Sequence, residues 1–181
     1  MTIAIMMDFE TLATDINTVI LTMGACKFDP KGSGIIDRIE LRPTIEEQTE
    51  KYGRVISDDT VEWWGKQSPE AIEEAFGEQN RTSFRDCMEK LAKFSWNASS
   101  VWSNGSCFDV MIAETAFKQL DITCPWQYCA IRDCRTLYEI AGVSLKDKKY
   151  GSKTTHKAIE DAEHQAIVAQ DAYRKLMRAG F

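Results

Sequence analysis

Long hydrophobic runs are missing from this sequence. Its 181 residues include no apolar stretch that approaches the roughly 20 residues needed by a membrane-spanning helix. Segment 1–7 carries no Lys or Arg, and its apolar run is too short for a secretory signal peptide. We therefore expect no membrane partner and a cytoplasmic location. Internal repeats, low-complexity segments and linkers are missing too, so a single domain over residues 1–181 is expected.

Cysteine pairs of the Cys-x-x-Cys type are absent as well. The chain has six cysteines, of which Cys124, Cys129 and Cys134 are evenly spaced. No common zinc site has this spacing. We expect reduced thiols that are mostly buried and pack as small hydrophobic side chains.

A positive net charge is the third absence. The formal net charge of −6 argues against a protein that coats nucleic acid through its overall field. It leaves room for a local site in which divalent cations and a few lysines supply the positive charge. The segment "LKDKKYGSKTTHK" is either a solvated loop or a phosphate contact, and its Gly151 and Ser152 suggest mobility. Its lysines are Lys146, Lys148, Lys149, Lys153 and Lys157.

The hydrophobic pattern predicts an α/β fold with a mixed five-stranded sheet flanked by helices. Three strands come first, and the turn residues "DPKGSG" favour a hairpin between the second and third. Helices and strands alternate after them, and Thr154 or Thr155 is the expected cap of the last helix. The predicted strands are 3–9, 18–29, 34–42, 99–104 and 126–133, and the predicted helices are 57–67, 68–76, 83–96, 108–120, 134–142 and 155–177.

Acidic side chains stand where hydrophobic segments end. Asp8 and Glu10 close the first strand, and positions i and i+2 of a strand share one face, so their charges lie side by side. Asp109 opens a helix after the fourth strand, and Asp161 follows His156 at the start of the last helix. Taken singly, Asp109 could be a helix cap and Asp161 an exposed carboxylate. As a set, these carboxylates and one nearby His are what two divalent cations require.

The expected cations are Mg²⁺, for which Mn²⁺ would substitute. Mg²⁺ prefers carboxylate and water ligands in near-octahedral geometry. Two such ions about 4 Å apart clamp the attacking and leaving oxygens of a phosphodiester displacement. Cations would also relieve the repulsion that otherwise raises the pKa values of Asp8 and Glu10.

Three motifs resemble those of the DEDDh 3′–5′ exonucleases. They are the strand end "DFET", the "FD" after the fourth strand and the "HKAIED" spacing, in the family's order. The His-x-Ala-x-x-Asp pattern is the most specific, because the sibling DEDDy group has Tyr instead. The segments "SDDTVEWWGKQSPEA", "VWSNGSCFD" and "RDCRTLYEIAG" are similar to the compact phage and bacterial branch, which includes phage exodeoxyribonucleases and a mycobacterial-type exoribonuclease. The resemblance covers nearly the whole chain.

This resemblance implies an RNase H-like fold and hydrolysis of single-stranded nucleic acid from its 3′ end, with release of nucleoside 5′-monophosphates. It implies that Asp8, Glu10 and Asp161 bind one cation. Asp8 would also bind the second, with Asp109 holding that ion directly or through water. His156 would be the general base that takes a proton from the attacking water, a role suited to an imidazole.

Four further residues are candidates for substrate contact. The resemblance implies that Thr11 and Leu12 contact the terminal nucleotide. The resemblance also places Asn104 in a loop beneath the site, and Phe108 could stack on a base. Core packing is the alternative for both Leu12 and Phe108.

Two adjacent tryptophans and a second histidine lie outside the three motifs. Trp63 and Trp64 point about 100° apart on a helix, so one is expected in the core and the other at the substrate cleft or a partner subunit. His164 lies eight residues beyond His156. We expect it to pack or to form a helix hydrogen bond, and not to act as a second base.

Other protein classes remain as alternatives. Haloacid dehalogenase-like phosphatases have an Asp-x-Asp-x-Thr strand end, but Glu10 replaces the second Asp and "HKAIED" would be unexplained. An inactive nucleic-acid-binding domain would show a broken motif residue, and none is broken. Relatives act on DNA or RNA, and we favour DNA slightly, with an exoribonuclease as the alternative. Many relatives are homodimers, although this sequence shows no dimer seam.

Overall fold

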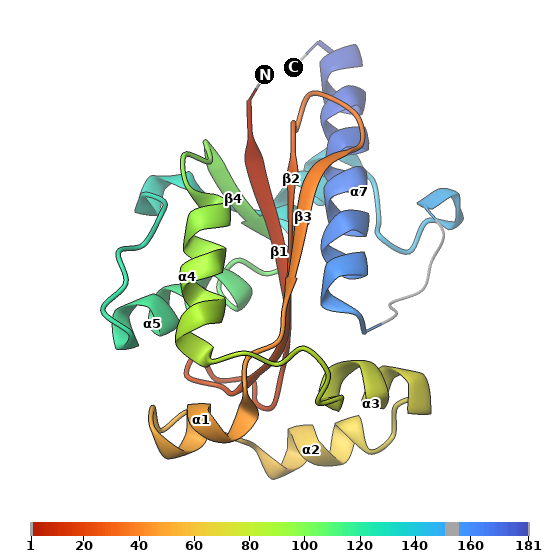
Figure 1. Cartoon of the computed structure of the whole chain (residues 1–181). Helices are drawn as coiled ribbons and strands as arrows, with labels where there is room; N and C mark the ends of the chain where they lie inside the picture. Colours follow the sequence, from red (N-terminus) through yellow and green to blue (C-terminus); the bar gives the residue numbers. More distant parts are fainter. Residues whose placement is uncertain (1, 151–155, 181) are drawn as a thin grey trace.

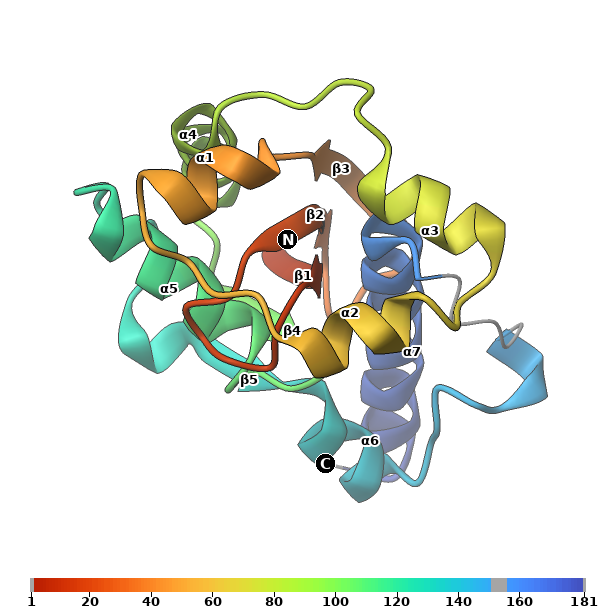
Figure 2. The same ribbon diagram turned by 90° about the horizontal axis from the view of Figure 1, so that it is seen from below.

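The first strand lies at the centre of the sheet. β1 (Ala4–Thr11) pairs antiparallel with β2 (Ile20–Phe28) and parallel with β4 (Ser100–Ser103). β3 (Ile35–Leu41) completes a hairpin at one edge, and β5 (Ile131–Asp133) adds a parallel strand at the other. The strand order is β3-β2-β1-β4-β5 (Figures 1 and 2). The predicted mixed five-stranded sheet is confirmed.

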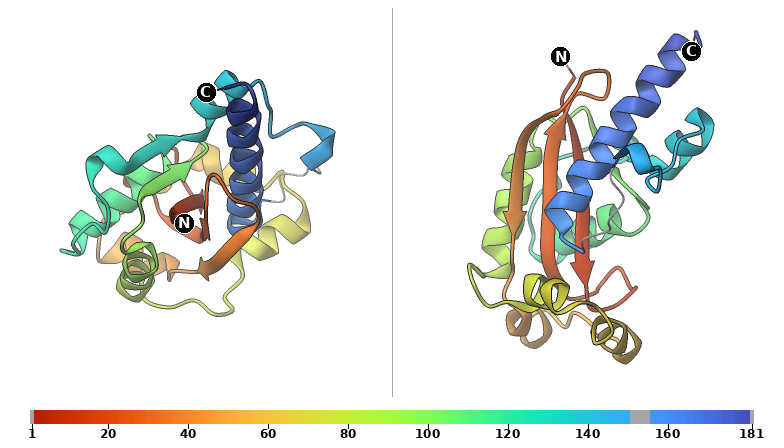
Figure 3. Two further views of the ribbon diagram at one scale, coloured as in Figure 1. Left: turned by 90° about the horizontal axis from the view of Figure 1, so that it is seen from above. Right: turned by 90° about the vertical axis from the view of Figure 1, so that its right-hand side faces the viewer.

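Helices cover both faces of the sheet in this computed structural model, which describes residues 2–150 and 156–180. On one face lie α4 (Phe84–Ser95) and α5 (Asp109–Gln119). On the other lie α6 (Cys134–Ala141) and α7 (Ala158–Arg178), and α7 crosses the central strands (Figures 1 and 3). Among the described helices, none is long and apolar enough to cross a bilayer.

The alternation of side chains along β1 decides which face its carboxylates occupy. Ile5, Met7 and Phe9 join the core beneath α4 and α5, whereas Ala4 and Met6 join the core beneath α6 and α7. Asp8 and Glu10 continue the second series. They therefore lie on the face that α7 covers.

Three short helices close the end of the sheet at which β1 ends. They are α1 (Ile45–Glu50), α2 (Asp58–Trp64) and α3 (Pro69–Phe76), and Figure 2 shows them from below. α3 begins as its sequence predicts, because the Ser68 hydroxyl accepts a hydrogen bond from the Ala71 amide at 3.2 Å. α1 was not expected from the sequence pattern.

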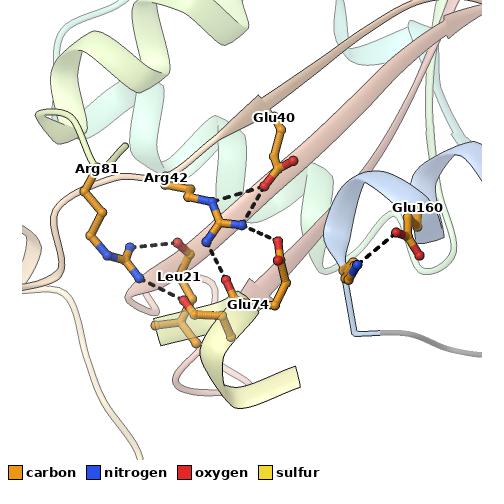
Figure 4. Close-up of polar contacts among 8 residues, drawn as sticks. Leu21, Glu40, Arg42, Glu74, Arg81 and Glu160 are labelled. Carbon is orange, nitrogen blue, oxygen red and sulfur yellow. Dashed lines mark hydrogen bonds and ion pairs between the residues drawn. The ribbon is translucent and has the colours of Figure 1, made fainter. Parts of the chain in front are cut away.

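Two arginines attach α3 to the sheet. Arg42, directly after β3, donates to the carboxylates of Glu40 and Glu74 (Figure 4). Arg81 donates to the carbonyls of Leu21 in β2 and Ala75 in α3. These bonds fix α3 against the end of the sheet.

Two of the sequence expectations need correction. The last strand was predicted over 126–133, but only Ile131–Asp133 pairs, because Tyr128–Ala130 form a 3₁₀ turn and the partner strand β4 is itself only four residues long. The cysteines are all free, but they are not mostly buried. Cys107 and Cys129 are exposed, since one lies in a loop and the other in that 3₁₀ turn.

The residues expected to cap the last helix lie outside the described part of the chain. Helix α7 begins at Ala158, with Lys157 as its N-cap residue. Thr154 and Thr155, the expected caps, belong to the segment 151–155 that the structure does not describe.

Candidate active site

A glycine in the neighbouring strand allows α7 to approach the acidic end of β1. Gly24 of β2 pairs with Asp8 across the sheet. A Cβ atom built on Gly24 would lie 2.2 Å from the backbone carbon of Ala158, which is closer than real atoms come. The first turn of α7 therefore rests directly on the strand backbone, as a glycine inside a strand permits. This contact brings Asp161 to the pair on β1.

Three carboxylates gather at this point. Asp8, Glu10 and Asp161 each offer one oxygen, and these oxygens lie within 4.8 Å of one another. Carboxylate oxygens at such spacing are the ligands that a hard divalent cation prefers. The donor set therefore fits a magnesium-type ion, and it contains the three residues expected to hold one cation together.

The fourth carboxylate reaches the same strand from the opposite side. Asp109 is the first residue of α5 and is 5% exposed. Its Oδ1 accepts a hydrogen bond from the backbone amide of Phe9 at 3.1 Å. Because Phe9 stands between Asp8 and Glu10, this bond places Asp109 beside the pair. Asp109 does not act as the N-cap of α5, a position that Phe108 occupies.

Burial raises the pKa values of three of these carboxylates, Asp8, Glu10 and Asp109. Burial raises the pKa of Glu10 to about 8, with further contributions from the charges of Asp161 and Asp109. Burial is also the main reason why the pKa of Asp109 rises to about 7. The pKa of Asp8 is raised by burial and by all three neighbouring acids. Without cations, the site therefore holds protons at neutral pH.

These shifts predict how the stability of the metal-free protein depends on pH. The ordinary pKa values are 4.5 for Glu10 and 3.8 for Asp109, so the folded state binds more protons than the unfolded state between about pH 4 and pH 8. The free energy of unfolding must then fall as pH rises. In EDTA, we expect the thermal midpoint to drop by roughly 5–10 °C between pH 5.5 and pH 8.

Divalent cations should reverse this trend. Mg²⁺ bound at these carboxylates would displace the protons, so it should raise the thermal midpoint more at pH 8 than at pH 5.5. Glu10→Gln should flatten the pH dependence in EDTA, whereas Glu50→Gln, a change at an exposed residue of α1, should not. A midpoint in EDTA that rises with pH would contradict the coupling.

His156 is held against two tryptophans of α2. Its ring centroid lies 5.2 Å from that of Trp63 and 6.1 Å from that of Trp64. Its φ is 51°, a left-handed conformation that is uncommon for a non-glycine residue. Trp64 also donates from its indole nitrogen to the Thr11 carbonyl at 3.0 Å. The candidate base is therefore connected to the end of β1 through α2.

The tryptophans divide the roles expected of them. Trp64 is buried in the core, whereas Trp63 is 43% exposed. Trp63 lines a pocket of about 450 Å³ together with Glu10, Thr11 and Phe108. The two adjacent side chains nevertheless meet on the same partner, because their large rings both reach His156.

The remaining substrate candidates, Leu12 and Asn104, do not line this pocket. Leu12 is 3% exposed and packs with Val19 and Trp64 in the core. Asn104 is exposed in the turn between β4 and α5. Among the described residues, those that line the pocket include neither Leu12 nor Asn104.

The lysine-rich segment is partly engaged with acids of α7. Lys149 lies 2.7 Å from the carboxylate of Asp171, and Lys157 lies 3.2 Å from that of Glu160. His164 packs near Tyr150, with ring centroids 6.4 Å apart. Gly151, Ser152 and Lys153, to which mobility and phosphate contact were attributed, lie outside the described residues.

Two residues of the site are not among those predicted from the sequence. Gly24 sits inside a buried strand, which is itself a signal of close backbone approach. Gln165 donates from Nε2 to Asp8 Oδ1 at 2.8 Å. Its position four residues after Asp161 places it on the same face of α7. This spacing is the sequence signal that could have predicted its place at the site.

Comparison with known proteins identifies the family. Residues 3–173 match the model of the 3′–5′ exoribonuclease Rv2179c-like domain. The chain belongs to this family. The membership confirms the resemblance carried by the DEDDh motifs, and it removes the phosphatase alternative. No curated protein sequence matches the chain.

Solved structures show that the Rv2179c-like domain has the fold of DEDDh exonucleases. E. coli exonuclease I in complex with a dT13 oligonucleotide is 12% identical with a TM-score of 0.72, covering 99% of this chain. The match spans 42% of the length of exonuclease I. The nuclease domain of 3′hExo, a DEDDh family member bound to rAMP, is 12% identical with a TM-score of 0.55, covering 98% of this chain and 92% of that domain.

Proposed function

We propose that this chain is a metal-dependent 3′–5′ exonuclease that removes nucleoside 5′-monophosphates from single-stranded nucleic acid. The grouping of Asp8, Glu10 and Asp161 within 4.8 Å carries this proposal. Family membership supports it, and so does the fold shared with exonuclease I, whose structures hold dT13 and dA16 oligonucleotides.

The four carboxylates would hold two divalent cations, Mg²⁺ or Mn²⁺. Asp8, Glu10 and Asp161 would bind one, and Asp8 with Asp109 the other. Bound cations would acidify the attacking water and neutralise charge on the phosphodiester. The chain's own contribution is rigidity, because strand pairing fixes Asp8 and Glu10 while the Phe9 amide fixes Asp109.

His156 would remove the proton from the attacking water at one of its ring nitrogens. Trp63 and Trp64 hold the imidazole edge-on from one side, with ring planes at 86° and 72° to it. Such support limits the orientations of the ring, and a well-oriented base contributes more to proton transfer.

The pocket beside Glu10 would receive the 3′-terminal nucleoside. Trp63 and Phe108 provide aromatic surface in its wall, and Thr11 lies next to the carboxylate pair. Stacking on an aromatic side chain accepts any base, which suits an enzyme that shortens strands one nucleotide at a time.

Trp63→Ala is expected to raise KM on the order of tenfold, because base stacking is worth about 1–3 kcal/mol. Steady-state kinetics on a short oligonucleotide would measure this change. Trp96→Ala is the matched control, since Trp96 is 62% exposed and follows α4 on the opposite face of the sheet. A loss confined to kcat would contradict the stacking role and assign Trp63 to support of His156 alone.

The choice between DNA and RNA stays a prediction. The family model is described by activity on RNA, whereas the exonuclease I structures contain DNA. Our slight preference for DNA therefore competes with an exoribonuclease as the second candidate. Matched single-stranded DNA, single-stranded RNA and duplex substrates, compared at equal concentration, would decide between them.

The direction of attack is tested with end-blocked oligonucleotides. A block at the 3′ end should stop degradation, a block at the 5′ end should not, and the product should be nucleoside 5′-monophosphate. No mononucleotide release with Mg²⁺ or Mn²⁺ would overturn the proposed function. It would leave the inactive nucleic-acid-binding domain as the better account.

A further inference from the structure

Gln165 is a buried amide that touches the acidic cluster. It is 5% exposed and lies one turn beyond Asp161 on the face of α7 that meets β1. Its Nε2 donates to Asp8 Oδ1 at 2.8 Å, a bond between residues 157 positions apart in the chain. This bond joins the last helix to the first strand at the site itself.

The backbone around Gln165 is anchored independently. Tyr138 of α6, which is 6% exposed, donates its hydroxyl to the Gln165 carbonyl at 2.8 Å. This bond fixes the turn of α7 from which the side chain projects. Two packed helices therefore hold the amide against Asp8, and the Gln165 side chain has few other conformations available.

An amide suits this position better than the charged alternatives. The N–H donor satisfies one oxygen of Asp8 without adding a negative charge to a crowded acidic site. It also brings no positive charge that would compete with a cation. An ionised Asp8 can only accept hydrogen bonds, so the amide has one orientation as long as Asp8 is charged.

The oxygen atom of the same amide has no hydrogen-bond partner among the described residues. Gln165 Oε1 is fully buried and accepts no hydrogen bond from that part of the chain. Buried acceptors are generally satisfied by protein or ordered water. An open acceptor next to a carboxylate cluster indicates a place for the hydration shell of a bound ion.

We propose that Gln165 is a positioning residue of the cation site. Its Nε2 holds one oxygen of Asp8 and leaves the other free for a cation, while Oε1 receives a hydrogen bond from cation-associated water. The inference rests on the proposed function in one respect, which is that Asp8 binds a divalent cation. Neighbours of this kind commonly change metal affinity by ~10–100-fold.

Helix α7 offers a matched control. Gln170 is also buried, at 1% exposed, and its Nε2 donates to the carbonyls of Asp29 and Gly34 at 3.0 Å each. Its Oε1 accepts from the Gly34 amide at 2.9 Å. Gln170 therefore holds the β2–β3 hairpin and does not take part in the acidic cluster.

The test is Mn²⁺ binding to the full chain, measured by calorimetry after removal of metals with EDTA. Gln165→Met keeps the length of the side chain but cannot donate, and it should weaken Mn²⁺ binding ~10–100-fold. Gln170→Met should lower the thermal midpoint and leave the Mn²⁺ affinity unchanged. A folded Gln165→Met protein with the wild-type affinity would overturn the inference.

A second measurement needs no substitution. In the wild-type protein, the side-chain NH₂ resonances of Gln165 should shift when Mg²⁺ is added, whereas those of Gln170 should not. Mg²⁺ binding that leaves the Gln165 resonances in place would overturn the inference.

Neither measurement uses nucleic acid, so the two proposals can fail separately. If the wild-type chain digests no substrate but Gln165→Met weakens Mn²⁺ binding, the proposed exonuclease activity is overturned and the role of Gln165 is supported. Normal digestion together with unchanged affinity would overturn the role of Gln165 alone.

Discussion

Asp8→Asn is expected to lower the rate of nucleotide release at least ~10³-fold while the chain stays folded. Asp8 lies among the other three carboxylates. Burial raises its pKa most, and the charges of Asp109, Glu10 and Asp161 raise it further. The substitution keeps the size of the side chain and removes a charge that both proposed cations would need. It also removes repulsion, so the metal-free protein should be at least as stable as the wild type.

The matched control for this change is Asp86→Asn. Asp86 is exposed in the first turn of α4, on the face of the sheet opposite α7, and its loss should leave turnover unchanged. Thermal unfolding in EDTA would separate a catalytic defect from a folding defect. Near-normal turnover by a folded Asp8→Asn protein would show that the cation ligands are assigned wrongly.

His156→Asn is expected to reduce kcat by ~10²–10⁴-fold, the usual contribution of a general base. Asn is chosen because the φ of 51° at this position strains most side chains, and Asn accepts the left-handed region better than Ala does. The substitution should remove proton transfer without disturbing the backbone that leads into α7.

Metal binding distinguishes this prediction from the first one. His156 is not one of the grouped ligands, so calorimetry with Mn²⁺ should give the wild-type affinity for His156→Asn and a greatly reduced affinity for Asp8→Asn. Loss of Mn²⁺ binding in the His156 variant would contradict its role as the base. His164→Asn, a change within α7, should leave both kcat and metal affinity near the wild-type values.

The cap of short helices holds His156 through aromatic packing. α2 carries Trp63 and Trp64 to His156, and α3 is tied to the sheet by Arg42 and Arg81. The carboxylates depend instead on strand pairing and on the close approach of α7 to Gly24.

Local pattern was enough to predict the architecture and the acidic pair. A period of two along β1 places Asp8 and Glu10 on one face whatever the rest of the chain does. The turn "DPKGSG" predicts the hairpin of β2 and β3, and Ser68 before Pro69 predicts the start of α3. The predicted length of the last strand was wrong, because the number of residues that pair in β5 depends on its partner β4.

Long-range packing decided the rest of the site. The sequence determined which residue types are present and which face each one occupies, because backbone geometry repeats over a few residues. Only the tertiary structure decided that Gln165 bonds Asp8, that two adjacent tryptophans share His156, and that Leu12 joins the core. Such contacts join elements far apart in the chain, and they depend on how closely whole elements approach. At Gly24, the absence of a single Cβ atom sets that distance.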